Sequence, residues 1–426
     1  LHVHHHFPSI STLILLATVY FLMKRYEPRM VLFLSGLILC TIAWAPIEAF
    51  LGFSKAIKAA PVIETIAGSM AFAYVMQYTK CDAHLVHLLS SGLTKLGPKL
   101  LIPGAIFITA FVHMSVPSAA GCVASVGPVL IPILKGAGVH PVMAATILFA
   151  GTFGATMLHP GFHQNVIISE ATHRTPVDIV GNHFYIILIV GAVVIVGVTL
   201  VAYYLKEQSG YVDESMKEEF QVDILKALSP LVPLLLILLG SMNIIPALKV
   251  LKIAYAMIIG AMVLCVVTRT GPGEITKAFF KGFGEGFQSI YGIIICSGVF
   301  VAGLTTCGLL KVMIDFMKTN PDLARLTGSF GPFVLAVICG SGDAASLAFN
   351  QAITPLAGAL GIAPMDLGSS AAFAGCLGRT MSPVAGCAMV CCALAGTDNP
   401  VDLAKRNAPV MIVAVTVMTI LFFMHS

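Results

Sequence analysis

Long apolar runs recur along nearly the whole chain, and this feature constrains the fold more than any other. A helix of about 20 apolar residues crosses about 30 Å of hydrocarbon. Only 10% of the residues are charged and 58% are hydrophobic, whereas soluble domains carry about 25% charged residues. The runs also lack the period-two alternation of an outer-membrane barrel. We therefore expect an all-α polytopic membrane protein embedded in a lipid bilayer.

Most apolar segments have the length of a single crossing. The expected crossings lie near 9–23, 30–50, 60–79, 141–175, 183–205, 228–246, 252–268, 288–310, 367–396 and 407–424. Two further regions, 98–139 and 328–363, are too long for one crossing and are interrupted by "HMSVPSAAGC" and "CGSGDAASLA". Exposed backbone at membrane depth is tolerated only where it is buried in protein or lines a cavity. Each region is therefore expected to form a re-entrant helical hairpin.

The two halves of the chain repeat each other. "FAGTFGATMLHP" (149–160) resembles "FAGCLGRTMSP" (373–383), and "TPVDI" (175–179) resembles "NPVDL" (399–403). Both matches keep one offset of 224 residues (373 against 149, 400 against 176), which chance similarity among small residues does not explain. The polar stretch 206–226 separates the copies. We expect a first repeat at 1–205, a cytoplasmic linker, and a second repeat at 227–426.

Each repeat is expected to contain five crossings, one hairpin (98–139 or 328–363) and one broken helix (141–175 or 367–396). Because five is odd, the second copy enters from the opposite side, as in the inverted-topology repeats of many secondary transporters. Positively charged loops favour the cytoplasm. Lys80, Lys135 and Lys226 lie on the side richer in Lys and Arg, which we assign to the cytoplasm. Both termini are then periplasmic.

Arg379 and Asp343 are charged residues in otherwise apolar surroundings. A charge within a membrane helix is costly and usually marks a pathway or a pair. The planar guanidinium of Arg379 fits a carboxylate through two parallel hydrogen bonds. It is expected either to bind a substrate carboxylate or to pair with Asp343. Asp343, at a hairpin tip, is also a candidate to bind Na⁺ or to carry a proton.

Four stretches are expected to converge: the tips 115–121 and 340–346 and the breaks 156–165 and 379–387. Interrupted helices expose N–H groups that favour anions, and their unwound carbonyls hold cations. The candidate substrate-binding residues are Ser115, Pro117, Ser118, Gly121, Thr156, His159, His163, Asn165, Gly340, Ser341, Gly342, Arg379, Thr380, Ser382, Pro383 and Gly386. The candidate coupling-ion residues are Asp343, Ser341 and Ser118. Single serines in such helices also bond back to their own backbone, which is the structural alternative.

No metal or organic cofactor is expected, apart from Na⁺ or H⁺ as a coupling ion. The eleven cysteines lie almost entirely in apolar stretches without zinc-site spacing, so we interpret them as small packing residues. The histidines of "LHVHHHFPSI" at residues 1–10 are not expected to form a functional metal site. The net charge of +4 does not indicate a nucleic-acid partner, because the basic residues lie in short loops.

The second half resembles a known family through "GSGDAASLAF", "LGRTMSPVAG" and "NPVDLAKRNAPV". These motifs are similar to those of the anaerobic C4-dicarboxylate carriers of the DcuC type, and the first half is similar in outline. The resemblance implies transport of succinate, fumarate, malate or aspartate across a bacterial inner membrane. It also implies an elevator-like motion and a homodimer. The chain departs from the family pattern at Asp343, where Asn is expected, and at 159–163, where a Thr-Ser-Gly-Asp-like stretch is expected.

Three alternatives remain open at this point. The carrier could take another organic anion, such as a tricarboxylate, an amino acid or a monocarboxylate. "Gly-x-Gly-Asp" also occurs in intramembrane aspartyl proteases, but that chemistry needs a second carboxylate at the site. No other Asp or Glu lies centrally in an expected crossing; Glu170 and Asp315 lie near helix ends. A channel is disfavoured, because no ring-forming filter is present.

Overall fold

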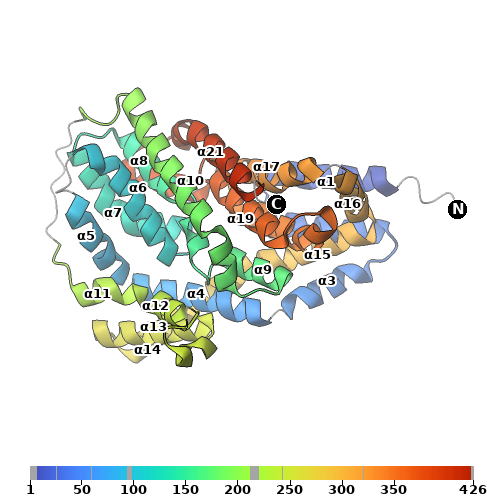
Figure 1. The fold of residues 1–426 in the computed structure, drawn as a ribbon, viewed down its shortest axis with the longest axis horizontal. Coiled ribbons are helices and arrows are strands. Elements are labelled where there is room, and N and C mark those ends of the chain that lie inside the picture. The colour runs from blue at the N-terminus through green and yellow to red at the C-terminus, as the bar shows by residue number, and fades with distance from the viewer. Residues whose placement is uncertain are drawn as a thin grey trace.

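The computed structural model describes residues 7–24, 26–58, 60–93, 98–211, 220–241, 243–319 and 321–423. Every regular element within these ranges is a helix (Figure 1), which confirms the expected all-α class. The histidines at 2–6 and the middle of the linker, 212–219, lie outside the described residues. Predictions that concern those residues therefore stay predictions.

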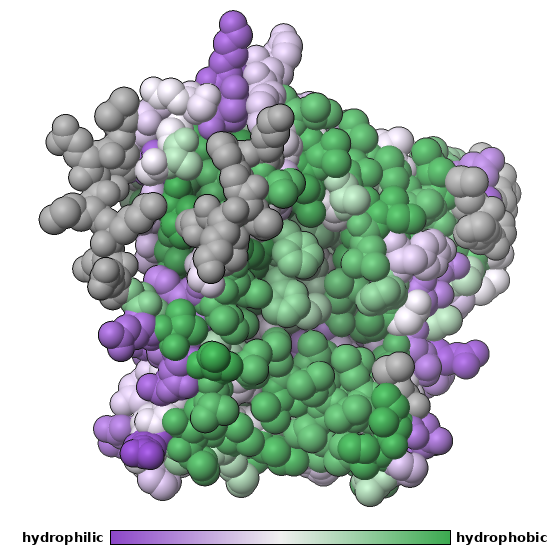
Figure 2. All heavy atoms as spheres, turned by 60° about the vertical axis from the view of Figure 1, so that its left-hand side comes forward, coloured by the Kyte–Doolittle hydropathy of each residue, from purple (hydrophilic) through white to green (hydrophobic). Residues whose placement is uncertain are grey.

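Among the described residues, five helical stretches are long and apolar enough to cross a membrane: Ala119–Gly136, Pro141–Thr172, Pro176–Tyr204, Asp322–Cys339 and Pro400–Phe423. Several other apolar helices are shorter, such as Pro28–Ile42 and Ile253–Thr268. Figure 2 shows a face covered largely by hydrophobic side chains, with hydrophilic ones mainly around its margins. The apolar surface fits a lipid-facing protein, while the number and direction of the crossings stay predictions.

In the first part of the chain, two helices match the expected crossings 9–23 and 60–79, while the expected crossing 30–50 is divided. In order the helices of this part are α1 (Phe7–Met23), α2 (Pro28–Ile42), α3 (Ile47–Ile57), α4 (Ala60–Tyr78) and α5 (Cys81–Leu93). The segment 30–50, expected as one crossing, is divided between α2 and α3. Trp44 has a left-handed φ of 59°, and Pro46 precedes α3. A left-handed residue followed by proline ends one helix and lets another begin.

Two adjacent helices and one interrupted helix complete the first half. They are α6 (Pro98–Ser115), α7 (Ala119–Gly136), α8 (Pro141–Gly151), η1 (Ala155–Leu158) and α9 (His163–Thr172), followed by α10 (Pro176–Tyr204). Ser118 caps α7 by accepting a hydrogen bond from the Gly121 amide at 3.2 Å. Gly154 has φ 131°, and a Cβ there would lie 2.9 Å from the Phe373 ring. Both conditions require glycine at this break.

The second half begins after the linker. Its elements are α11 (Ile224–Leu228), η2 (Ser229–Leu231), α12 (Val232–Ser241), η3 (Pro246–Val250), α13 (Ile253–Thr268), α14 (Pro272–Gly286), the π-helix η4 (Phe287–Tyr291), α15 (Gly292–Thr306), α16 (Leu309–Thr319), α17 (Pro321–Cys339), α18 (Gly342–Ala352), η5 (Thr354–Leu360), α19 (Pro364–Arg379), α20 (Gly386–Ala395) and α21 (Pro400–Phe423). The amphipathic helices α14 and α16 were not predicted. Both carry charged residues among apolar ones, so neither reads as an apolar run.

The two halves interlock rather than sit as separate bodies. Helix α4 packs against α13 and α14, whereas α15 packs against α2 and α3. Near the helix breaks, α20 packs on α7 and α8, and α18 packs on α9 and α19. Helices α10 and α21, which hold the same place in the two halves, contact each other. Inverted topology and re-entrant hairpins stay predictions, but this packing brings the expected tips and breaks together.

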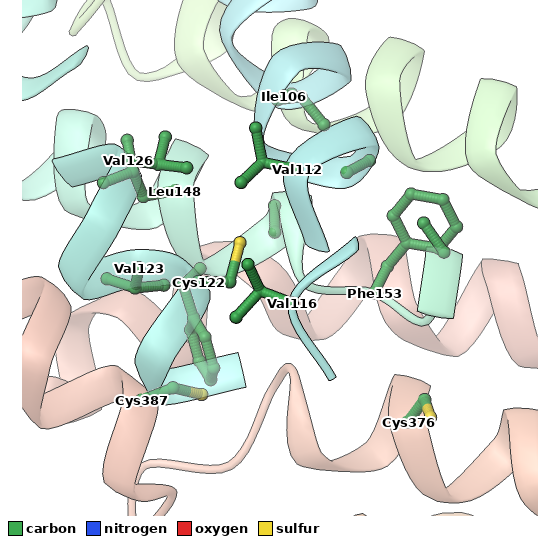
Figure 3. Packing of buried hydrophobic residues seen from close by; sticks show 14 of the residues in the cluster. Ile106, Val112, Val116, Cys122, Val123, Val126, Leu148, Phe153, Cys376 and Cys387 are labelled. Atoms are coloured by element: carbon green, nitrogen blue, oxygen red, sulfur yellow. The ribbon is translucent and has the colours of Figure 1, made fainter. Parts of the chain in front are cut away.

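The largest buried apolar cluster joins residues of both halves. Figure 3 shows Val116, Cys122, Val123 and Leu148 packed closely, with Cys387 from the second half beside them. Cys122 and Cys387 are both buried free thiols, used here as small packing groups. Small side chains let helix backbones approach closely in membrane proteins. The core thus fixes the position of the helix starts that surround the site.

Candidate functional site

A cavity of about 440 Å³ lies where four helices begin. It is lined by residues at the starts of α7, α9, α18 and α20 and by Arg379 at the end of α19. The first N–H groups of a helix have no partner within the helix and carry partial positive charge. Four helix N-termini and one guanidinium around one cavity form a site suited to an anion.

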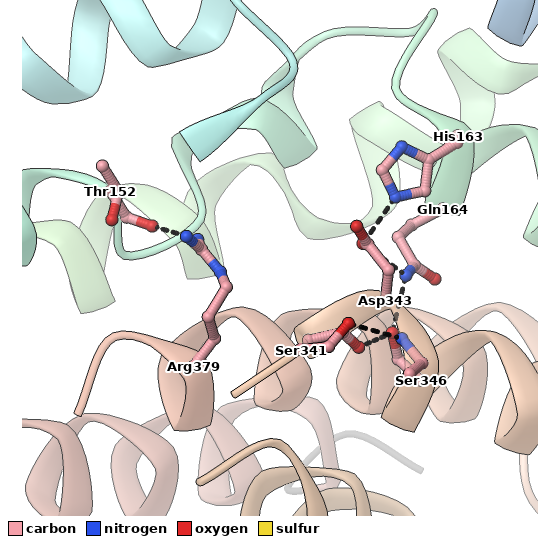
Figure 4. Close-up of polar contacts among 9 residues, drawn as sticks. Thr152, His163, Gln164, Ser341, Asp343, Ser346 and Arg379 are labelled. Atoms are coloured by element: carbon pink, nitrogen blue, oxygen red, sulfur yellow. Dashed lines mark hydrogen bonds and ion pairs between the residues drawn. The ribbon is translucent and has the colours of Figure 1, made fainter. Parts of the chain in front are cut away.

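Arg379 is positioned by the other helix break. Its Nη2 donates a hydrogen bond to the carbonyl oxygen of Thr152 at 2.7 Å (Figure 4). Its Nη1 lies 3.4 Å from the sulfur of Cys387. Thr380 Oγ1 is 3.3 Å from the same Thr152 oxygen. Within the ranges that the structure describes, Arg379 forms no ion pair with a carboxylate. Its charge is therefore available to a bound anion.

Asp343 pairs with the first half of the chain instead of with Arg379. Its Oδ1 lies 2.6 Å from His163 Nε2 and accepts from Gln164 Nε2 at 3.3 Å (Figure 4). Gln164 also donates to Ser346 Oγ at 2.6 Å. Ser341 caps α18 by accepting from the Ala344 amide at 3.1 Å. The start of α18 and the start of α9 are thus joined through side chains at one end of the cavity.

Several predicted site residues brace the first break instead of lining the cavity. Asn165 Nδ2 donates to the carbonyls of Met157 at 2.8 Å and His159 at 3.0 Å. His159 Nδ1 accepts from the Gly161 amide at 2.9 Å. His183 bonds to the Met157 carbonyl at 2.9 Å. These side chains satisfy backbone groups that the interrupted helix leaves unpaired.

The predicted residues divide into two groups. Those that line the cavity are Pro117, Ser118, Gly121, Thr156, His163, Gly340, Ser341, Gly342, Asp343, Arg379 and Gly386. Those outside its lining are Ser115, His159, Asn165, Thr380, Ser382 and Pro383. In the second group, Ser382 Oγ donates to the Val337 carbonyl at 2.7 Å. Thr380 Oγ1 bonds back to Cys376 at 2.8 Å, the structural alternative stated for such hydroxyls.

Sequence reasoning missed other lining residues: Met70, Tyr74, Gln77, Ala119, Ala120, His113, Phe162, Glu285, Ile290, Cys376 and Cys387. Gln77 and Tyr74 come from α4. This helix was expected as a crossing without an internal break, so no local signal marked its residues as part of a site. Glu285 comes from α14, which was not predicted. His113 belongs to the quoted tip sequence, and a histidine in an apolar run was the signal that could have found it.

The central cavity adjoins another cavity at one flank of the molecule. This larger cavity of about 890 Å³ shares Gln77 and Gly121 with the central cavity and runs along α5 and α7. We call this larger cavity the vestibule. Lys80 lines it, and Asp82 accepts a hydrogen bond there from Ser125 Oγ at 2.5 Å. The vestibule therefore opens on the side that the sequence assigns to the cytoplasm.

The opposite flank has a separate cavity of about 540 Å³, lined from α3, α9, α15 and α18. Among the described residues it shares no lining residue with the central cavity. Gln351 Nε2 donates to the Ile294 carbonyl at 3.3 Å, and Tyr291 Oη donates to the Ala56 carbonyl at 2.6 Å. These hydrogen bonds join α18 to α15 and η4 to α3 beside this cavity.

Interrupted helices that meet around a cavity suited to an anion, within an apolar all-α fold, are typical of secondary transporters. The family model of the C4-dicarboxylate anaerobic carriers (DcuC) matches residues 65–426, and the chain belongs to this family. The family and its named relatives are transporters, not enzymes, which removes the protease alternative.

Relatives match over most of their length. A protein of Haemophilus influenzae described as an uncharacterized transporter is 39% identical over 272 residues, covering 61% of this chain and 97% of the relative. The anaerobic C4-dicarboxylate transporter DcuC of Escherichia coli K12 is 22% identical over 443 residues, covering 96% of this chain and 95% of its own. The similarity therefore extends to the first half, which the family model covers only in part.

Two solved structures share the fold. MtrF of Neisseria gonorrhoeae, from a class of antimetabolite efflux pumps, aligns with a TM-score of 0.62 and 14% identity, covering 88% of this chain and 83% of its own. The YdaH transporter of Alcanivorax borkumensis aligns with a TM-score of 0.59 and 16% identity, covering 87% and 85%. At these identities the likeness concerns the fold alone.

Proposed function

We propose that the protein is a secondary active transporter of C4-dicarboxylates, such as succinate, fumarate and malate, across a bacterial inner membrane. One observation carries the proposal: Arg379, unpaired with any described carboxylate, lines the same cavity as four helix N-termini. Membership of the C4-dicarboxylate carrier family supports the substrate class. The cavity also lies within the volume range of about 300–1,000 Å³ that is usual for small-ligand sites.

In the proposed binding mode, Arg379 holds one carboxylate of the substrate. The second carboxylate binds the Ser118 hydroxyl and the backbone N–H groups of Ala119, Ala120 and Gly386, at the starts of α7 and α20. Both subsites are positive, which favours a dianion over a monoanion. Glu285 and Asp343 also line the cavity and would accept the ammonium group of an amino diacid such as aspartate.

We assign the coupling of transport to an ion gradient to Asp343, which binds H⁺ or Na⁺. The alternative is exchange of one dicarboxylate for another without a coupling ion. Its contact with His163 Nε2 at 2.6 Å ties the second hairpin to the first broken helix, so a change in its charge alters the contact between the halves. The transport cycle is of elevator type in a homodimer, with both termini in the periplasm. The vestibule along α7 is the cytoplasmic entrance, and the flank near Gln351 opens when the cycle turns outward.

The test is uptake of radiolabelled succinate into proteoliposomes, with and without internal fumarate, under imposed Na⁺ or proton gradients. Mono-, di- and tricarboxylates and aspartate compete in parallel. Arg325→Ala is the matched control. Arg325 forms an ion pair with Asp322 at 3.4 Å, and neither residue lines the cavity. Strong competition by four-carbon diacids supports the proposal. Absence of succinate flux, with uptake of another labelled anion class, contradicts the proposal and assigns the carrier to that other class of substrate.

A further inference from the structure

His113 is a buried polar side chain without a partner at the edge of the central cavity. It is 2% exposed, and its Nδ1 has no hydrogen-bond partner among the described residues. It lines the cavity from α6, two residues before that helix ends at Ser115. Buried polar atoms nearly always have partners, because an unsatisfied one is destabilising. An unpaired imidazole nitrogen beside a ligand cavity indicates that a ligand supplies the partner.

Thr156 provides a second, independent atom of this kind. It is 2% exposed, and its Oγ1 is also buried without a partner among the described residues. It lines the same cavity from η1, and η1 packs directly against α6. The two unpaired groups therefore come from neighbouring elements on one wall of the cavity.

The other polar side chains of the cavity differ from these two. Asp343 is occupied by His163, and Ser341 caps its own helix. Arg379 is oriented by its bond to Thr152, a residue of the same helix break as Thr156. His113 interacts electrostatically with both Arg379 and Asp343. His113 and Thr156 thus line the same cavity as the cation that is expected to hold a carboxylate.

A carboxylate has about four lone-pair sites that accept hydrogen bonds. A guanidinium fork fills two of them, which leaves two for other donors. A neutral imidazole has one N–H donor and a threonine hydroxyl has another. A carboxylate bound by Arg379 therefore keeps two free acceptor sites, one for His113 and one for Thr156.

We infer that His113 and Thr156 complete the Arg379 subsite, each donating a hydrogen bond to the same substrate carboxylate. His113 is then a specificity-determining residue for the carboxylate end of the substrate, in a role that the sequence motifs do not assign. This inference rests on the proposed function, because it takes the ligand to be a carboxylate. A hydrogen bond to a charged group is worth about 10- to 100-fold in affinity.

The test compares His113→Leu, His113→Asn and Thr156→Val with wild type in two measurements. The first is the KM for succinate in proteoliposomes, and the second is the melting temperature of the ligand-free protein in detergent. His113→Leu is expected to raise KM about 10- to 100-fold while the melting temperature stays equal or rises, because an unsatisfied buried atom has been removed. His113→Asn restores part of the affinity through its amide donor, and Thr156→Val raises KM without lowering the melting temperature.

His183→Leu is the matched control. His183 is also fully buried, but its two ring nitrogens are paired with the Met157 carbonyl at 2.9 Å and Ser369 Oγ at 3.0 Å. Its loss is expected to lower the melting temperature and leave KM unchanged, the reverse pattern. A lower melting temperature with unchanged KM in His113→Leu overturns the inference.

The inference and the proposed function fail in different ways. If wild type neither transports nor is stabilised by succinate, the proposed substrate is wrong. The stabilisation of wild type and His113→Leu by the panel of other carboxylates then still decides the role of His113. Equal stabilisation of the two proteins by every carboxylate that binds wild type overturns it.

Discussion

The two helix breaks hold the same place in the two halves of the chain but are built differently. The first, between Gly151 and His163, is braced by its own polar side chains: Asn165 bonds two of its carbonyls, and His159 accepts from one of its amides. The second, between Arg379 and Gly386, places a cation at the cavity. The first break is thus held by bracing contacts to its own backbone, whereas the second presents a cation to the cavity.

The two breaks also depend on each other. Arg379 of the second break donates to the Thr152 carbonyl of the first, and Asn407 of α21 donates to the Thr380 carbonyl at 3.0 Å. Arg379, which is proposed to hold the substrate, is therefore oriented by the first break. The first break has no equivalent charge, because Ala155 stands at the position that corresponds to Arg379. Variants of residues that line the cavity, such as Arg379, should change transport, and variants of residues that brace the backbone, such as Asn165, should change stability.

The largest effect is expected from Arg379. Removing one partner of a buried charged contact costs about 2–5 kcal/mol, so Arg379→Ala should reduce kcat/KM for succinate by at least about 30-fold. Arg379→Lys should also be strongly impaired, because one ammonium group cannot hold the Thr152 carbonyl and a carboxylate in the same fork geometry. Succinate uptake by proteoliposomes measures both variants. Unchanged KM in both would remove Arg379 from the substrate site.

Asn165→Ala should produce the opposite pattern. It leaves the carbonyls of Met157 and His159 without these partners, at about 1–3 kcal/mol for each buried group left unpaired. The melting temperature in detergent should fall, while the fraction that remains folded transports with the wild-type KM. If KM rises while stability is unchanged, Asn165 contacts substrate, and the division between the two breaks is wrong.

Asp343→Asn separates coupling from binding. The amide keeps a hydrogen-bonding group beside His163 and Gln164 but loses the charge that an ion would neutralise. We expect exchange of internal for external dicarboxylate to persist while the dependence of net uptake on an ion gradient is lost. Uptake driven by imposed Na⁺ and proton gradients measures this effect. Ion dependence equal to that of wild type would place the coupling site elsewhere.

Ser382→Ala should have the smallest effect of the set. Although Ser382 belongs to the second break, its hydroxyl donates to the Val337 carbonyl and lies outside the cavity lining. The expected loss is about 0.5–1.5 kcal/mol of stability, with KM unchanged in the uptake assay. A clear rise in KM would show that the cavity extends deeper into the second break.

Local chemistry made the interruptions predictable. Pro117 and Ser118 at one tip, Gly340 and Ser341 at the other, and Pro160 and Pro383 near the breaks all act on the backbone within a few residues. The helices end just before these residues: α6 ends at Ser115, and α17 ends at Cys339. Composition was enough for the all-α class, and motif spacing was enough for the family.

Partners far apart in the chain were not predictable in the same way. Arg379 meets Thr152 across 227 positions, and His163 meets Asp343 across 180. No local signal identifies which of several polar residues near a break turns toward the cavity and which satisfies the backbone. His159 and Asn165 were grouped with His163 for this reason. Only the packing of α9 against α18 and α19 separates them.

The most direct test of the account is the melting temperature of purified protein in detergent as succinate is added, for wild type and Arg379→Ala. A ligand that binds the folded state raises this temperature by an amount that grows with the ratio of its concentration to its Kd. The account predicts a rise for wild type with succinate but not with acetate, and little or no rise for Arg379→Ala. Equal stabilisation of both proteins by succinate would contradict the claim that Arg379 holds the substrate.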